Sequence, residues 1–214
     1  GIDGGLTKIK LQQLIKVASI DRIVLSTDDE IVKAIGRDLR NEKIRIDDRP
    51  AQLATAATST DDLIRYVATI IPNGHILWTH VTSPFLDTVD YEKIIEQYFN
   101  CFANGYDSLM TVTPIHKFLW NQQGAINYDR AAEKWPRTQT RRPIYEVNSG
   151  AFLAHTDIYN WQADRIGKKP FLYETDERKS YDIDWEINFE IAEQMWRQNN
   201  SEFIPAIRNS KLPQ

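Results

Sequence analysis

The segment SYDIDWEINFEIAEQMW, residues 180 to 196, places two carboxylates two residues apart, Asp182 and Asp184, ahead of a stretch with helical apolar spacing. If residues 181 to 184 are extended, both side chains point to one face, because side chains alternate along a strand. Two hard oxygen ligands on one face suit a hydrated Mg²⁺ that bridges to substrate phosphates. Alternatively, Asp184 caps the following helix while Asp182 is solvated, and spacing alone favours this interpretation.

Two further segments place polar residues after predicted strands. STDD, residues 26 to 29, could receive a nucleotide, although the simpler interpretation is that Thr27 or Asp28 caps the next helix. DDRPAQLATAATST, residues 47 to 60, joins Arg49 to small hydroxyl residues that open a helix. Such an arrangement could bind an anion or a nucleobase edge, and a surface loop is the equal alternative.

A histidine and a basic loop are candidates for binding a second substrate. THVTSPF, residues 79 to 85, ends a buried strand with polar residues, so His80 either faces a cleft or is a satisfied structural histidine. The loop KWPRTQTRRP carries Arg137, Arg141 and Arg142, which could clamp a phosphate or carboxylate or could simply be solvated.

The elements that must position these residues alternate along the first half of the chain. RIVLSTDDE, IRIDD and HILWTHVTSP have strand composition, and each is followed by a segment with helical spacing. Ser59 and Asp62 predict a capping box for the second of these helices, and Asn104-Gly105 predicts the end of the third. The alternation predicts a mostly parallel sheet covered by helices on both faces, with ligands at the carboxyl ends of the strands.

The second half is expected to elaborate the same domain. DSLMTVTP, GAINYD, YEVNSGAFLAH and KPFLYET are strand-like with shorter intervals, and no linker or repeat divides the chain. Residues 1–214 are therefore predicted to form a single α/β domain.

Composition excludes several function classes. A net charge of -4 argues against nucleic acid as a partner, and no apolar run approaches the length of a membrane span. The lone Cys101 and the absence of a signal-peptide pattern in GIDGGLTKIK make the cytoplasm the expected location. The motifs of dinucleotide-binding folds, P-loops and serine hydrolases are absent from the sequence.

Taken in order, six segments resemble the acylneuraminate cytidylyltransferases, the CMP-sialic acid synthetase family, across nearly the whole chain. They are DRIVLSTDDE, RPAQLAT with TST, THVTSPF, PRTQ, NSGAFLAH and YDIDWEINFEIAE. The resemblance implies a three-layer nucleotidyltransferase α/β fold. It also implies that CTP and a nine-carbon sugar acid, a nonulosonic acid, are converted into the CMP-sugar and pyrophosphate.

The resemblance also assigns roles to residues. Arg49 matches the arginine of the family's RPAEL segment, and Thr58 and Thr60 match the small residues around the cytidine. Asp182 and Asp184 match the paired aspartates that hold Mg²⁺ in the family, so the metal interpretation becomes the favoured one.

The chain departs from the family pattern in three places. GIDGGLTKIK does not match the basic glycine loop ARGGSKG that cradles the triphosphate, and offers only glycines with Lys8 and Lys10. His80 replaces the usual glutamine, and Glu146 and Val147 stand where the family has its carboxylate-binding arginine. The candidate residues for the sugar side are His80, Lys117, Arg137, Arg141 and Arg142.

The resemblance further implies a homodimer in which a strand-rich excursion, residues 114–150, reaches the partner. Two rival hypotheses stay open: another sugar nucleotidylyltransferase, such as one for 3-deoxy-manno-octulosonate, or a catalytically silent binding or oligomerisation protein of the same fold.

The missing phosphate loop generates a prediction of its own. Departing pyrophosphate needs donors and cations arranged around it. We therefore expect further N-terminal residues that carry a basic glycine loop. Intact mass spectrometry should give a mass above 24.9 kDa, whereas a mass equal to this sequence would favour the silent protein.

Overall fold

The computed structural model describes residues 4–137 and 143–199, so Arg141 and Arg142 lie outside the described residues. The described chain forms two compact units, one that ends at Asp182 and one that begins at Ile183. The second unit contains helix α6, Glu186–Asn199, which the apolar spacing of residues 187 to 195 predicts. Whether the two units act as one domain stays a prediction.

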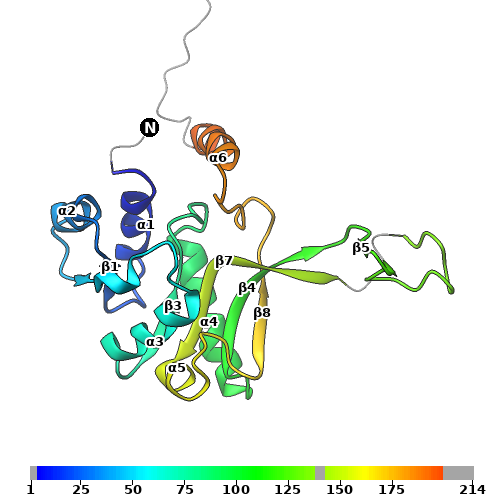
Figure 1. Cartoon of the computed structure of the whole chain (residues 1–214), viewed down its shortest axis with the longest axis horizontal. Helices are drawn as coiled ribbons and strands as arrows, with labels where there is room; N and C mark the ends of the chain where they lie inside the picture. The colour runs from blue at the N-terminus through cyan, green and yellow to red at the C-terminus, as the bar shows by residue number, and fades with distance from the viewer. Residues whose placement is uncertain (1–3, 138–142, 200–214) are drawn as a thin grey trace, which may run out of the picture. The chain divides into compact units, whose positions relative to one another are not determined.

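The first half of the chain alternates helices and strands as predicted (Figure 1). Its elements are α1 (Gly5–Ile15), β1 (Ile23–Thr27), α2 (Glu30–Asp38), β2 (Ile44–Asp48), the 3-10 turn η1 (Ala51–Leu53), α3 (Thr60–Ile70), β3 (His75–Trp78) and α4 (Thr88–Ala103). Strand β1 pairs with β2 in parallel from Ile23 opposite Ile44 to Thr27 opposite Asp48. Their carboxyl ends therefore lie side by side.

Side-chain caps begin three of these helices. The predicted capping box of α3 is confirmed, with Ser59 and Asp62 bonding each other's backbone N–H groups. Asp87 and Asp90 form a second box at the start of α4. The cap of α2 is Asp29, which accepts from the N–H groups of residues 31 and 32, and not Thr27 or Asp28 as predicted. Thr27 is the last residue of β1 and α2 begins at Glu30, which places the cap at Asp29.

The second half forms most of a four-stranded sheet in the order β3-β7-β4-β8. The new elements are β4 (Ser108–Ile115), β5 (Trp120–Asn121), β6 (Gly124–Ala125), β7 (Ile144–His155), α5 (Thr156–Gln162) and β8 (Pro170–Glu174). Strand β7 runs antiparallel to both β3 and β4, whereas β8 is parallel to β4. The strands are therefore more mixed in direction than predicted, because β7 returns beside β4 at the end of the arm that carries β5 and β6 (Figure 1).

Helices cover both faces of this sheet, as predicted. On one face α4 contributes Tyr91, Ile94 and Tyr98 to a core that also contains Leu109 and Leu153. The same core extends to α1 and to apolar residues of β1 and β2. On the other face a smaller core joins α3 and α5 to the sheet through Ile64, Ile76, Ala154 and Tyr159.

A buried lysine fastens α1 to the segment that follows β3. Lys10 is 3% exposed, and its Nζ donates to the Ser83 carbonyl at 2.8 Å and to the Tyr91 hydroxyl at 2.5 Å. The Thr79 hydroxyl donates its single hydrogen to the Gly150 carbonyl at 2.7 Å, so the Tyr91 hydroxyl donates to Thr79 at 2.8 Å. One chain of bonds thus joins α1, α4, β7 and the segment after β3.

This burial predicts a characteristic pH dependence. Desolvation lowers the pKa of Lys10 from 10.5 to about 7, although the charges of Asp90 and Asp182 oppose the shift. Between these two pKa values the unfolded chain binds more protons than the folded one, so the contribution of Lys10 to stability grows as pH rises from 7 towards 10.5 and is lost as pH falls to 7. Its slope is at most about 1.4 kcal/mol per pH unit.

We expect Lys10→Met to remove this slope from the free energy of unfolding, measured by urea denaturation at several pH values. Lys16→Met, at the exposed residue that caps the end of α1, controls for the loss of a lysine. An unchanged slope in Lys10→Met would show that Lys10 keeps its charge when buried.

Candidate active site

Arg49 lies where β1 and β2 end, on the side assigned to the nucleotide. Its Nη2 donates to the Ser26 carbonyl at 2.5 Å and its Nε to the Ser26 hydroxyl at 3.4 Å. The Ser26 hydroxyl donates to Asp47 at 2.8 Å, and the Tyr66 hydroxyl of α3 donates to the same carboxylate at 2.9 Å. The structure thus holds a cation and a carboxylate at the carboxyl ends of two parallel strands, the place where ligands bind in sheets of this kind.

Of the two predicted cytidine-side threonines, Thr58 lies between η1 and α3, and Thr60 begins α3. Thr58 is close to Thr55, with their hydroxyl oxygens 3.1 Å apart, and its hydroxyl also donates to the Gln52 carbonyl at 3.4 Å. Thr60 is the first residue of α3 and is exposed. Thr58 therefore orders this loop, whereas Thr60 stands beside the free N–H groups of a helix start.

His80 follows β3 and is partly buried. Its Nε2 accepts hydrogen bonds from Trp78 Nε1 and from Arg165 Nη1, each at 3.1 Å. Because tryptophan and arginine only donate, the imidazole must be neutral with its proton on Nδ1. Burial and the charge of Arg165 both lower the pKa of His80, while Asp182 opposes them.

Asp182 belongs to the same neighbourhood. Its Oδ1 lies 3.5 Å from the Ser83 hydroxyl. Burial lowers the pKa values of both His80 and Lys10, and the charge of Asp182 opposes this lowering. Ser83, at the end of the segment from residue 79 to residue 83, therefore contacts both the Asp182 carboxylate and the Lys10 amino group.

Asp184 lies in the other unit and is exposed. Helix α6 begins at Glu186, and the residue before it, Trp185, donates its N–H to the Asn188 side chain at 3.0 Å. Asp184 is thus one position too early to be the N-cap, which removes the helix-cap explanation for this carboxylate. Among the described residues, no group of three or more histidine, cysteine, aspartate or glutamate side chains could hold a metal ion.

In the NSGA segment of β7, Asn148 has a structural role. Asn148 is buried, and its side-chain amide donates to Thr113 at 3.1 Å and to Thr175 at 3.0 Å. It therefore links β7 to β4 and to the residue after β8. Glu146 and Val147, which stand where the family has an arginine, are exposed on the same strand.

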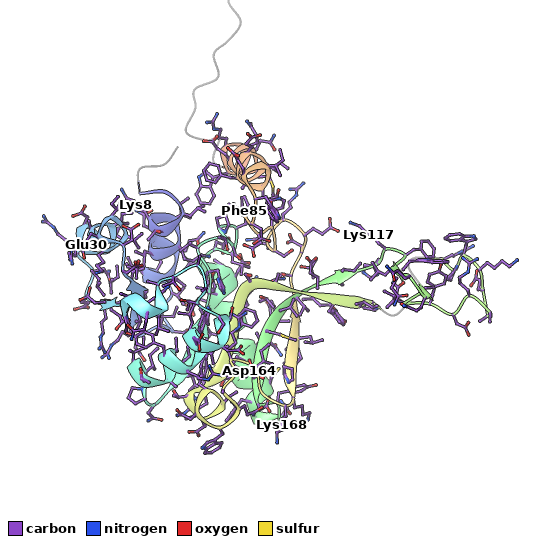
Figure 2. The ribbon with its side chains drawn as sticks, in the orientation of Figure 1. Lys8, Glu30, Phe85, Lys117, Asp164 and Lys168 are labelled. Carbon is purple, nitrogen blue, oxygen red and sulfur yellow. The ribbon has the colours of Figure 1, made fainter. Side chains whose placement is uncertain are left out.

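The remaining sugar-side candidates lie on the arm between β4 and β7. Lys117 is exposed at its base (Figure 2), and its carbonyl accepts from the Asn127 side chain at 2.8 Å. Arg137 is exposed at the last described position before the gap. Binding of the acceptor sugar by Lys117 and Arg137 stays a prediction.

Sequence reasoning missed Lys10 as a structural residue and missed Arg165 altogether. The sequence offers Lys10 together with Lys8 as a possible phosphate-binding cation, but the Lys10 amino group points into the core. The signal for its burial is its position between Ile9 and Leu11, both buried in α1. Arg165 lies 85 residues from His80, in a loop without a motif, so only the fold reveals their contact.

The chain is similar in sequence to known cytidylyltransferases. The model of the cytidylyltransferase family matches residues 4–210. An N-acylneuraminate cytidylyltransferase of Escherichia coli O18:K1:H7 (strain RS218 / NMEC) is 22% identical over 215 residues, which cover 97% of this chain and 50% of that protein. The chain thus spans about half the length of this curated relative.

Solved structures share the fold. CMP:2-keto-3-deoxy-manno-octonic acid synthetase complexed with CTP superposes with a TM-score of 0.61 at 13% identity, over 91% of this chain and 88% of that one. The 4-diphosphocytidyl-2C-methyl-D-erythritol synthase of Anaerococcus prevotii gives a TM-score of 0.62 at 13% identity, over 90% and 86%. The predicted nucleotidyltransferase fold is confirmed, and the chain belongs to the cytidylyltransferase family.

Proposed function

We propose that the protein transfers CMP from CTP to a sialic-acid-like nonulosonic acid and releases pyrophosphate. The observation that carries the proposal is the match of the cytidylyltransferase family to residues 4–210, in a chain whose polar residues gather at the carboxyl ends of β1, β2 and β3. The curated relative is an N-acylneuraminate cytidylyltransferase, which supports a nonulosonic acid as the acceptor.

Another sugar acid is the second candidate. The structure of the CMP:2-keto-3-deoxy-manno-octonic acid synthetase covers most of this chain, so a 3-deoxy-manno-octulosonate acceptor is an alternative within the same reaction class. The departures from the family at His80 and at residues 146 and 147 lie on the acceptor side, and they favour testing both acids.

In the proposed reaction an acceptor hydroxyl attacks the α-phosphorus of CTP and pyrophosphate leaves. Arg49, Thr58 and Thr60 would bind the nucleotide, and the segment from Thr79 to Ser83 would border the acceptor. The chain's contribution is to hold both substrates in line and to exclude water, so no covalent enzyme intermediate is needed. Lys10 would fix the position of the acceptor segment without touching substrate, because its Nζ is hydrogen-bonded to Ser83 and Tyr91.

Mg²⁺ is part of the proposal, with Asp182 and Asp184 as its ligands. Mg²⁺ commonly takes one or two carboxylates and completes its shell with water and substrate phosphates. A single carboxylate beside Ser83, in a described chain without a cluster of three or more metal-binding side chains, fits such a substrate-borne metal better than a cage made of protein alone. When bound, the metal would neutralise charge on the triphosphate.

A homodimer and a cytoplasmic location belong to the same proposal. The arm between β4 and β7 exposes Trp120 and Trp135, and the Arg130 guanidinium lies 5.0 and 5.3 Å from their ring centres. Exposed aromatic residues with an arginine are common in interfaces, which supports the arm as the contact with a second copy. In the described part of the chain, no helix is long and apolar enough to cross a membrane.

A pyrophosphate-release assay with panels of nucleotides and acceptors tests the reaction. We expect CTP to be used in preference to ATP, GTP and UTP, and a nonulosonic acid to be used in preference to neutral sugars. Release with 3-deoxy-manno-octulosonate alone would favour the second candidate. No release from any pair would favour the silent binding protein.

Asp182→Asn and Asp184→Asn should each reduce Mg²⁺-dependent pyrophosphate release by more than about 100-fold, because each removes a hard ligand near the reacting phosphates. Glu177→Gln, an exposed carboxylate in the preceding loop, should leave release unchanged. Urea denaturation checks that the variants fold. Normal release from both aspartate variants would rule out their metal role, and unfolding of both would point to a structural one.

Arg49→Ala should weaken CTP binding about 10-fold or more, as expected for the loss of a charge-assisted hydrogen bond. Calorimetric titration with CTP measures the effect. Arg45→Ala, an exposed arginine earlier on β2, is the matched control. If both variants bind CTP like the wild type, Arg49 serves only to close the ends of β1 and β2 through Ser26.

A further inference from the structure

Arg165 is presented by a short loop whose backbone N–H groups bond two aspartate side chains. Residues 163 to 169 connect α5 to β8, and Figure 2 labels Asp164 and Lys168 on this loop. The Asp164 carboxylate accepts from the N–H groups of Arg165 at 2.7 Å and of Ile166 at 3.2 Å. At the other end the Asp107 carboxylate accepts from the N–H groups of Lys168 at 2.7 Å and of Lys169 at 3.0 Å. Asp164 therefore orders the start of the loop locally, and Asp107 fastens its end to the residue before β4.

The Arg165 side chain lies against a pair of aromatic rings on the sheet. Trp78 of β3 and Phe152 of β7 are directly opposite each other in the antiparallel register. The guanidinium carbon is 3.7 Å from the centre of the Phe152 ring and 5.3 Å from that of Trp78. Stacking of this kind fixes the plane of the guanidinium group and leaves its N–H edge available for planar, bidentate hydrogen bonds.

Most of the donors of Arg165 are unused. A guanidinium group has five N–H donors, and the bond from Nη1 to His80 is the one side-chain hydrogen bond that Arg165 makes among the described residues. The Asp164 carboxylate is engaged by the backbone. The charge of Asp164 favours the cationic form of Arg165, but no described carboxylate forms an ion pair with the guanidinium group. A partly buried cation without such a partner is costly, so the arrangement favours an anionic ligand.

The neighbours of Arg165 are consistent with such a ligand. His80 is neutral, so it neither repels an anion nor neutralises one, and it keeps an Nδ1 proton to donate. The Tyr159 hydroxyl is fully buried, has no hydrogen-bond partner among the described residues and lies within electrostatic range of Arg165. The buried Tyr159 hydroxyl and the unused donors of Arg165 are thus polar groups near each other that could bond a ligand.

We propose that Arg165 binds the carboxylate of the acceptor sugar acid, with its guanidinium plane set by Phe152 and Trp78 and one donor held by His80. This inference rests on the proposed function, because it assigns an acceptor group to the site beside β3. It supplies the cation that the chain lacks at Glu146 and Val147. The two oxygens of a carboxylate match two parallel N–H donors of the guanidinium edge.

Direct binding tests the inference without requiring catalysis. Calorimetry would titrate N-acetylneuraminate and 3-deoxy-manno-octulosonate, and the carboxamide of each, into the wild-type protein in the presence of CTP without Mg²⁺. In Arg165→Gln the affinity for the free acid should fall by about 10- to 100-fold, while the weak affinity for the carboxamide should change less than about 3-fold. Arg165→Lys should recover only part of the loss, because an ammonium group cannot bind both oxygens in one plane.

Lys168→Gln is the matched control, since it removes one positive charge from an exposed position on the same loop. It should leave the affinity for the acid unchanged. Equal losses for the acid and the carboxamide, unchanged acid binding in Arg165→Gln, or no binding of either acid to the wild type would each overturn the inference. So would a sugar phosphate that binds more tightly than the acids and loses affinity in Arg165→Gln. An acid that binds through Arg165 but is never cytidylylated would instead count against the proposed function alone.

Discussion

The buried amino group of Lys10 makes the contacts on which the geometry of the candidate site depends. It is the first donor in a chain that runs through Tyr91 and Thr79 to the Gly150 carbonyl, and it also holds the Ser83 carbonyl. Every hydroxyl in this chain both accepts and donates, so losing one member leaves a buried polar group without its partner. The segment that carries His80 therefore has a fixed position before any ligand arrives.

The candidate site contains two groups of polar residues. Arg49, Ser26 and Asp47 occupy the carboxyl ends of the parallel pair β1 and β2, whereas His80 and Arg165 lie beside the aromatic pair of β3 and β7. Helix α3 connects the groups physically, since Tyr66 bonds Asp47 and Ile64 packs in the core beneath β3. A transfer reaction needs a nucleotide and an acceptor held in relation to each other, and one shared helix can provide that relation.

The parts of the fold that the sequence predicts are those that depend on residues close together in the chain. Apolar periodicity and the Ser59–Asp62 box define α3, and the Asn104-Gly105 stop follows the end of α4. The antiparallel direction of β7 depends on pairing between distant segments, which periodicity does not encode. Lys10 resembles a surface lysine in the sequence, and only the convergence of Ser83 and Tyr91 makes its burial possible. Arg165 becomes a candidate for ligand binding because His80, Trp78 and Phe152 surround it, and no local sequence pattern brings these residues together.

The central claim is that the nucleotide binds at the ends of β1 and β2 and that the acceptor binds beside β3 and β7. Hydrogen–deuterium exchange of the full chain, read by mass spectrometry, tests this most directly. The account predicts that CTP slows exchange in residues 26–29 and 49–60 and that the sugar acid slows it in residues 79–83 and 164–167. Slowing by both ligands in the same single segment, or only on the arm between β4 and β7, would contradict it.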